Sequence, residues 1–256
     1  MDTYLNLNSP LPHRASTLTI GNFDGVHRGH QAVLAKLCET ARQDKGSSAV
    51  FTFKNHPSQV LRPHQACQHL CTPDHKIDLI AESGVDILFL MPFTLEFSRQ
   101  SAEAFLSDVR RVYPFKHLIL GHDATFGKDR EGNRDTLTKL AQQNGFTTEY
   151  LDEMQDNGLP ISSSRIRQLL SHGALKEAGH LLGRPYSIKS VVLEGYLDVA
   201  GLCLPPQGTY SVKSMIDGKE HKGVAYLEKH EHNEPRLKID FHQDLQGRTI
   251  EVIFNS

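Results

Sequence analysis

Two histidines three residues apart, His27 and His30, are the side chains of this sequence best placed to act on a phosphoryl group. They follow an apolar run ending at Ile20, typical of a strand, and precede the helical pattern from Gln31 to Leu37. The turn between contains two glycines, which favour tight non-helical backbone. A helix N-terminus attracts anions, and two imidazoles beside it could stabilise charge developing on a phosphate. The alternative is a solvated histidine pair at a helix cap.

A second candidate is a run of three serines followed by an arginine. Ser162, Ser163 or Ser164 can cap the helix whose apolar pattern runs from Ile166 to Leu170. Their hydroxyls, the helix N-terminus and Arg167 together would form a receptor for a polyphosphate. Taken alone, the segment is explained better by an N-cap beside a solvated arginine.

The elements around these residues alternate between strand and helix. After the first strand, further strands are expected at 49–53, 86–91 and 117–120, and helices at 73–83, 101–112 and 136–144. This alternation predicts a doubly wound parallel sheet, of the Rossmann-like α/β class, covered on both faces. Ligands of such sheets bind beyond the carboxyl ends of the strands. The loops 21–30, 54–57 and 121–130 should therefore converge on one site.

The pattern changes past about residue 187. Short strand-like runs follow one another without helices, at 190–193, 209–214, 223–227, 237–241 and 249–254. This spacing predicts a small antiparallel β-barrel or sandwich. The sequence therefore predicts two domains, 1–186 and 187–256.

Composition excludes several classes of function. The 256 residues carry a formal net charge of −2, which gives no support to nucleic-acid binding. The first ten residues lack the features of a signal peptide, and no apolar run reaches membrane-spanning length. The four cysteines form no disulfide or zinc pattern, so a reduced cytoplasmic protein is expected. Cys67 and Cys71 lie among His64, His69 and His75, a weak metal candidate whose alternative is a polar surface segment.

The segment from Gly21 to His30 resembles the His-x-Gly-His signature of nucleotidyltransferases. In its longer form, Gly-Asn-Phe-Asp-Gly-Val-His-Arg-Gly-His, it resembles the bacterial bifunctional riboflavin kinase/FAD synthetase family. The segments 162–167 and 181–186 resemble further stretches of that family, and the resemblance covers roughly residues 17–190. It implies that domain 1–186 is an FMN adenylyltransferase, which uses ATP with Mg²⁺ and FMN as substrates and releases FAD.

The resemblance also implies roles for individual residues. The catalytic residues would be His27, His30 and Arg167; the ATP-binding residues Gly21, Asn22, Phe23, Asp24, Ser162, Ser163 and Ser164; and the flavin-binding residues Asn55, His56, Pro57, Asp123, Thr125 and Phe126. No metal ligand is assigned. The chain departs from the family at Ala124, where an aromatic ring is usual, and this removes contact surface for a flavin.

Residues 187–256 resemble the riboflavin kinase barrel in outline only. Its Gly-Phe-Pro-Thr-Ala-Asn motif is absent, and only nine residues separate Gly195 from Pro205. Pro235 stands at the position of the catalytic glutamate, with Glu234 beside it. We therefore expect a truncated barrel that is inactive as a kinase.

The leading hypothesis is an FAD synthetase with ATP and FMN as its partners, and with protein partners left open. The alternatives are an adenylyltransferase for another phosphorylated substrate and a flavin-binding or interaction protein without catalysis. The combination of His27, His30 and Arg167 favours an enzyme, because a binding protein would not need the three together.

Overall fold

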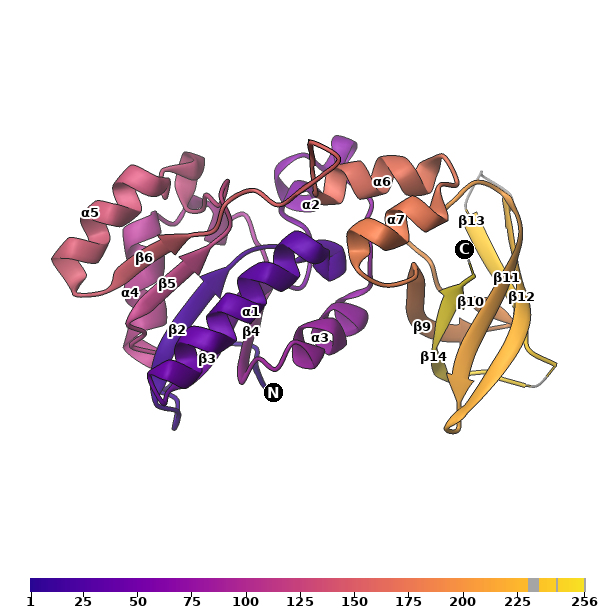
Figure 1. Cartoon of the computed structure of the whole chain (residues 1–256), viewed down its shortest axis with the longest axis horizontal. Coiled ribbons are helices and arrows are strands. Elements are labelled where there is room, and N and C mark those ends of the chain that lie inside the picture. Colours follow the sequence, from indigo (N-terminus) through magenta and orange to yellow (C-terminus); the bar gives the residue numbers. More distant parts are fainter. Residues whose placement is uncertain (230–234, 243, 256) are drawn as a thin grey trace. The chain divides into compact units, whose positions relative to one another are not determined.

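The computed structural model describes residues 1–229, 235–242 and 244–255. The chain divides into two compact units (Figure 1). Unit 1 comprises Met1–Phe23, Gly29–Cys67 and Ile77–Met154, and unit 2 comprises Asp24–Arg28, Gln68–Lys76 and Gln155–Ser256. This division by contacts differs from the functional boundary expected between residues 186 and 187, which stays a prediction.

Unit 1 is built on a six-stranded parallel sheet in the order β1-β4-β3-β2-β5-β6. Its strands are β1 (Asp2–Tyr4), β2 (Ala15–Ile20), β3 (Ser47–Phe53), β4 (Ile87–Met91), β5 (His117–Leu120) and β6 (Thr147–Tyr150). Its helices include α1 (Arg28–Gln43), α2 (Pro57–Leu61), α4 (Ala102–Val112) and α5 (Arg134–Asn144). Helix α3 (Pro73–Glu82) begins in unit 2, and its residues from Ile77 onward belong to unit 1. The predicted parallel sheet is confirmed, while β1 and β6 were not expected.

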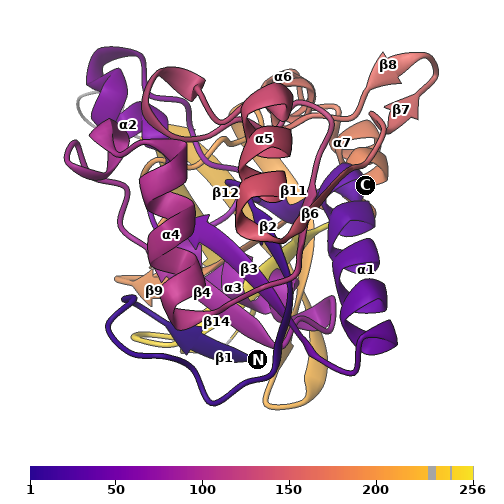
Figure 2. The same cartoon turned by 90° about the vertical axis from the view of Figure 1, so that its left-hand side faces the viewer.

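Helices cover both faces of this sheet (Figure 2). On one face, alternate residues of the central strands pack with α4 and α5 in a cluster that includes Phe51, Phe89 and Phe105. On the other face Thr17 donates its hydroxyl to the carbonyl of Leu37 in α1, at 3.1 Å. Because both faces are buried, a central strand such as β4, with the sequence Ile-Leu-Phe-Leu-Met, is a continuous apolar run.

Side-chain caps set the ends of the helices. Asn133 accepts a hydrogen bond from the amide of Thr136, so α5 begins two residues before the predicted start at 136. Gly145 ends that helix with φ of 69°, in the left-handed region where glycine is favoured. Ser101 caps α4 in the same way, through the amide of Ala104.

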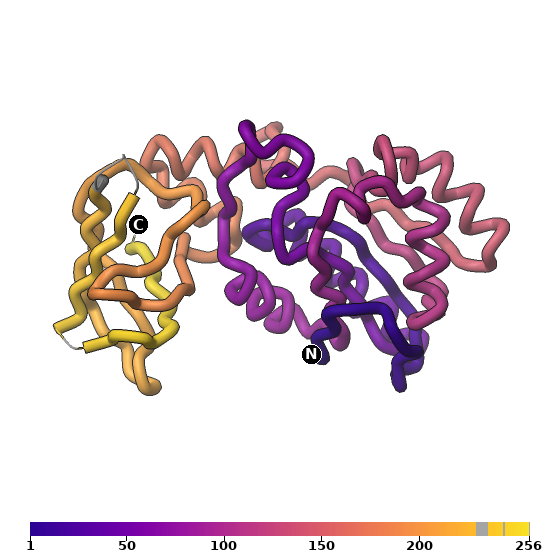
Figure 3. Tube along the Cα trace, turned by 180° about the vertical axis from the view of Figure 1, so that it is seen from behind, coloured from indigo at the N-terminus to yellow at the C-terminus, as the bar shows by residue number. Residues whose placement is uncertain are grey.

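Unit 2 contains a closed antiparallel barrel in the order β10-β13-β12-β11-β14-β9, traced in orange to yellow in Figure 3. The strands are β9 (Ser187–Leu193), β10 (Tyr196–Leu197), β11 (Gly208–Ile216), β12 (Lys219–Lys229), β13 (Pro235–Asp240) and β14 (Thr249–Phe254). The hairpin β7 (Gln155–Asp156) and β8 (Leu159–Pro160) and the helices α6 (Ser163–Ser171) and α7 (Leu175–Leu182) precede it. Of the two predicted alternatives, the barrel is confirmed. No helix in the described part of the chain has the length and apolarity needed to cross a membrane.

A buried histidine of unit 2 holds a carboxylate of the barrel. His75 is 2% exposed, and its Nε2 lies 3.4 Å from Oε1 of Glu251 on β14. The hydrogen bond from His75 lowers the pKa of Glu251 to about 2, and Ser187 and Arg184 act in the same direction. A carboxylate with a lowered native pKa stabilises the fold above its usual pKa of 4.5, and this contribution is lost as the pH falls toward 2.

We therefore expect Glu251→Gln to reduce the free energy of unfolding at pH 6 and to flatten its decline between pH 4.5 and 2. Denaturant unfolding at pH 6, 4.5 and 3 measures both effects. Glu220→Gln is the matched control, because Glu220 forms an exposed ion pair with Lys213 on the same barrel. Equal slopes in wild type and Glu251→Gln would contradict the prediction.

Candidate active site

The loop before α1 has an unusual backbone. Phe23, Gly25 and Val26 have φ of 49°, 74° and 39°, a region that β-branched residues rarely adopt. A Cβ on Gly25 would lie 2.8 Å from the Leu70 side chain, so glycine is required there. Helix α1 begins at Arg28, earlier than the predicted start. His27 therefore directly precedes the helix, and His30 lies in its first turn.

In unit 1, strand β3 fixes the start of this loop. The amide of Gly21 donates to the carbonyl of Phe51 at 3.1 Å, and Thr52 donates its hydroxyl to the carbonyl of Asn22 at 3.1 Å. The ring of His30 packs against the ring of Phe23, with centroids 5.1 Å apart. These contacts hold the imidazole of His30 at the carboxyl end of β2, the edge where parallel sheets bind ligands.

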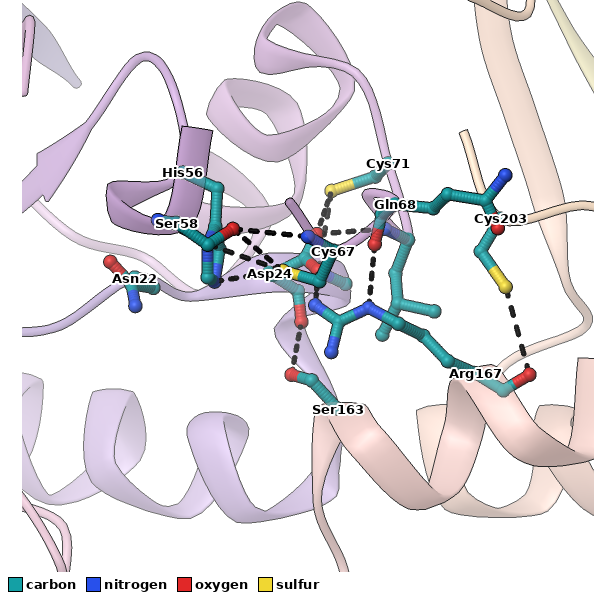
Figure 4. A network of polar contacts seen from close by, with 12 residues as sticks. Asn22, Asp24, His56, Ser58, Cys67, Gln68, Cys71, Ser163, Arg167 and Cys203 are labelled. Carbon is teal, nitrogen blue, oxygen red and sulfur yellow. Dashed lines mark hydrogen bonds and ion pairs between the residues drawn. The ribbon is translucent and has the colours of Figure 1, made fainter. Parts of the chain in front are cut away.

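In unit 2, Asp24 joins segments that lie far apart in the sequence (Figure 4). It is 5% exposed, and its carboxylate accepts from the amide of Leu70 at 2.9 Å and from Nη2 of Arg167 at 2.5 Å. Ser163 donates its hydroxyl to the Asp24 carbonyl at 3.1 Å. The structure thus brings together three of the predicted site residues, Asp24, Ser163 and Arg167. The ATP contact of Asp24 stays a prediction, since its carboxylate already has protein partners.

The serine run divides its roles at the start of α6. Ser162 is the N-cap of α6 and accepts a hydrogen bond from the amide of Arg165. Of the three serines that could cap this helix, the structure therefore selects Ser162. Arg167 uses Nε to bind the carbonyl of Gln68 at 2.6 Å, in addition to its ion pair. The alternative of a solvated arginine is wrong, because the Arg167 side chain is only 16% exposed.

The predicted flavin-binding residues of the 54–57 loop have structural contacts of their own within unit 1. The Asn55 amide donates to the carbonyl of Phe93 and accepts from its amide, at 2.9 and 2.8 Å. His56 caps α2 by accepting from the amide of Ser58, and Pro57 is the first residue of that helix. These contacts tie the loop after β3 to the loop after β4; contact with a flavin stays a prediction.

The three predicted flavin-binding residues of the 121–130 loop differ in how deeply they are buried. Phe126 is half-buried, with its ring 5.5 Å from that of Phe105, and Ala124 packs on the same aromatic cluster. Asp123 and Thr125 are exposed. Phe126 therefore contributes to the packing of unit 1, and the flavin role of all three predicted residues stays a prediction.

The cysteine and histidine residues around 64–75 take separate partners. Cys67 Sγ lies 3.2 Å from Nδ1 of His56, and Cys71 accepts from the amide of Gly25 at 3.3 Å. The described residues contain no group of three or more His, Cys, Asp or Glu that could hold a metal ion. The alternative of a polar surface segment is wrong at Cys71 and His75, which are buried. Burial raises the pKa of the Cys71 thiol to about 12.

Two sets of contacts on the loop were not expected from the sequence. The amide of Leu70 and the sulfur of Cys71 bind the loop from a segment that the sequence indicated only as a weak metal candidate. Arg184 donates to the carbonyls of Gly25 and Val26, at 2.9 and 3.3 Å. Arg184 lies in the family-like stretch 181–186, which was the available signal, but no role was assigned to it.

A parallel sheet with a His-x-Gly-His segment at its first helix, followed by an antiparallel barrel, defines a nucleotidyltransferase with a second, β-barrel part. The FAD synthetase family model matches residues 10–165, more than half of the sequence. The chain belongs to the FAD synthetase family.

Curated relatives agree with this assignment, and a solved structure has a similar fold. A protein of Listeria monocytogenes named bifunctional riboflavin kinase/FMN adenylyltransferase is 33% identical, over 92% of this chain and 81% of its own. Proteins of the same name from Bacillus subtilis and Escherichia coli K12 are 31% and 32% identical, over 93% and 96% of this chain and 82% and 85% of theirs. The crystal structure of a macrolide-efflux protein from Streptococcus pneumoniae is similar, with a TM-score of 0.85 and 27% identity over 99% of this chain and 90% of that one.

Proposed function

We propose that the protein transfers AMP from ATP to FMN, releasing FAD and pyrophosphate, and that it has no riboflavin kinase activity. The observation that carries the proposal is the loop 24–27, in which a buried ion pair between Asp24 and Arg167 ties the segment before His27 to helix α6. Membership of the FAD synthetase family supports FMN and ATP as the substrates.

In the proposed reaction a phosphate oxygen of FMN attacks the α-phosphorus of ATP, and the bond from that phosphorus to the β-phosphate bridging oxygen breaks. The FMN phosphate is ionised at neutral pH, so no general base is needed. His27 and His30 would stabilise the charge that develops on the α-phosphate. Nε and Nη2 of Arg167 bind Gln68 and Asp24, so Nη1 is the atom expected to face the departing pyrophosphate.

We expect Mg²⁺ to enter with ATP. Mg²⁺ in such sites is bound through substrate phosphates and one or two carboxylates, not by a complete protein cage. Both oxygens of the buried Asp24 carboxylate already have protein partners, the Leu70 amide and Arg167, so the phosphates of ATP would supply most of the ligands of Mg²⁺.

The experiment is incubation of the purified protein with FMN, ATP and Mg²⁺, followed by chromatography for FAD and an enzymatic assay for pyrophosphate. Formation of both in equal amounts supports the proposal. FMN binding without FAD would favour the flavin-binding alternative. AMP transfer to a different phosphorylated acceptor would favour the other adenylyltransferase.

Riboflavin supplied with ATP and Mg²⁺ is expected to give neither FMN nor FAD. Kinase chemistry needs a base for the ribityl hydroxyl and a metal held against ATP. Strand β13 begins with Pro235, which cannot act as a base, and the short connection from Gly195 to Pro205 contains the two-residue strand β10. Glu234 lies outside the described residues.

The measurement is chromatography of the flavins over time, with the bifunctional Listeria relative as the positive control for the kinase step. FMN as the starting material should still yield FAD from this protein. Accumulation of FMN from riboflavin, in protein free of contaminating kinase, would contradict the prediction.

A further inference from the structure

The loop that carries His27 is held in a backbone conformation that its own residues do not favour. Val26 has φ of 39° and is 1% exposed, and its neighbours Phe23 and Gly25 also have positive φ. Glycine adopts a positive φ freely, but Phe23 and Val26 do not, so their conformation persists only where the surroundings enforce it. The side chains that enforce this turn therefore decide where His27 lies.

Arg184 binds the strained turn at two consecutive peptide groups. Its Nη2 donates to the carbonyl of Gly25 at 2.9 Å and its Nη1 to the carbonyl of Val26 at 3.3 Å. The Val26 carbonyl belongs to the peptide bond that leads into His27. A guanidinium is a planar, permanently charged fork, so these two bonds fix the orientation of both peptide groups together.

The position of Arg184 is itself fixed. It follows Gly183, which ends α7 in the left-handed conformation with φ of 74°, and its Nη1 also donates to the carbonyl of Leu182 at 3.3 Å. The guanidinium therefore connects the end of a well-packed helix to the turn before His27, and both belong to unit 2.

We infer that Arg184 is a positioning residue for adenylyl transfer: by binding the Gly25 and Val26 carbonyls it holds His27 in the orientation that the transition state requires. The inference rests on the proposed function. Loss of the fork should lower kcat by roughly 10-fold to 100-fold, the scale of a displacement of about 1 Å in a reacting group. The KM values for ATP and FMN should change little, because Arg184 acts through the loop and not on the substrates.

The test compares Arg184→Gln and Arg184→Lys with a matched control, Arg110→Gln. Arg110 is a half-buried arginine of unit 1 that likewise binds two main-chain carbonyls, those of Phe115 and Asn144, at 2.6 and 3.0 Å. Assays at pH 7.5 lie far above the titration of Glu251, which Arg184 also influences. We expect Arg184→Gln to lose kcat, Arg184→Lys to recover part of it, and Arg110→Gln to lose thermal stability alone.

Amide hydrogen exchange of the peptide covering residues 23–29 gives a readout that does not depend on catalysis. It should become faster in Arg184→Gln and stay unchanged in Arg110→Gln. Unchanged kcat together with faster exchange would overturn the positioning role, and so would equal losses of kcat in Arg184→Gln and Arg110→Gln. If the wild type forms no FAD, the proposed function is wrong, and so is the predicted effect of Arg184 on kcat. The exchange rates would still show whether Arg184 holds the loop.

Discussion

Replacing His30 by alanine is expected to slow adenylyl transfer by at least about 10²-fold, the scale of losing one donor to a developing charge in a transition state. His30 lies in the first turn of α1, at the positive end of the helix dipole. The ring of His30 packs on the ring of Phe23, so the alanine variant also loses this ring contact. Because His30 is half-buried and outside the core, the variant should remain folded.

The measurement is the steady-state rate of FAD formation at saturating ATP and FMN, with circular dichroism and thermal unfolding recorded on the same preparations. His221→Ala is the matched control, since His221 is also half-buried but lies on β12 of the barrel. Near-normal turnover in His30→Ala would mean that His30 acts only in helix packing.

The sequence predicted the parallel sheet because both faces of its strands are buried, which leaves apolar runs that are easy to recognise. It predicted β5 at its observed bounds, His117–Leu120, since Gly121 follows directly. β1 has only three residues and pairs with β4 at the sheet edge, so its pattern is too short to identify. β10, with two residues, escapes recognition for the same reason.

The candidate site could be predicted only as far as its motifs reached. The histidine pair and the serine run are visible as residue types at a fixed spacing. The Arg167 ion pair was not visible, because Asp24 lies 143 positions earlier in the chain and a pair at that separation leaves no periodic signal. Main-chain donors such as the Leu70 amide are invisible in principle, since every residue other than proline has one.

Arg167→Ala is expected to lower both the stability of the fold and the efficiency with which the protein reacts with ATP. Removing one partner of a buried ion pair leaves the other charge uncompensated, which costs about 3–5 kcal/mol. Here the charge left behind is Asp24, which is 5% exposed. The same variant removes the cation proposed for the pyrophosphate, so the apparent KM for ATP should rise or kcat should fall. FMN binding measured alone by fluorescence quenching should change little.

Asp24→Asn separates the two effects. It removes the carboxylate charge but leaves the Arg167 guanidinium bound to the Gln68 carbonyl, so the cation stays available to ATP. We expect Asp24→Asn to lose stability in denaturant unfolding with a smaller change in ATP kinetics than Arg167→Ala. The double variant should be less destabilised than the sum of the single ones, because the two residues are in direct contact. Loss of FMN binding in Arg167→Ala with unchanged ATP kinetics would instead assign Arg167 to the flavin.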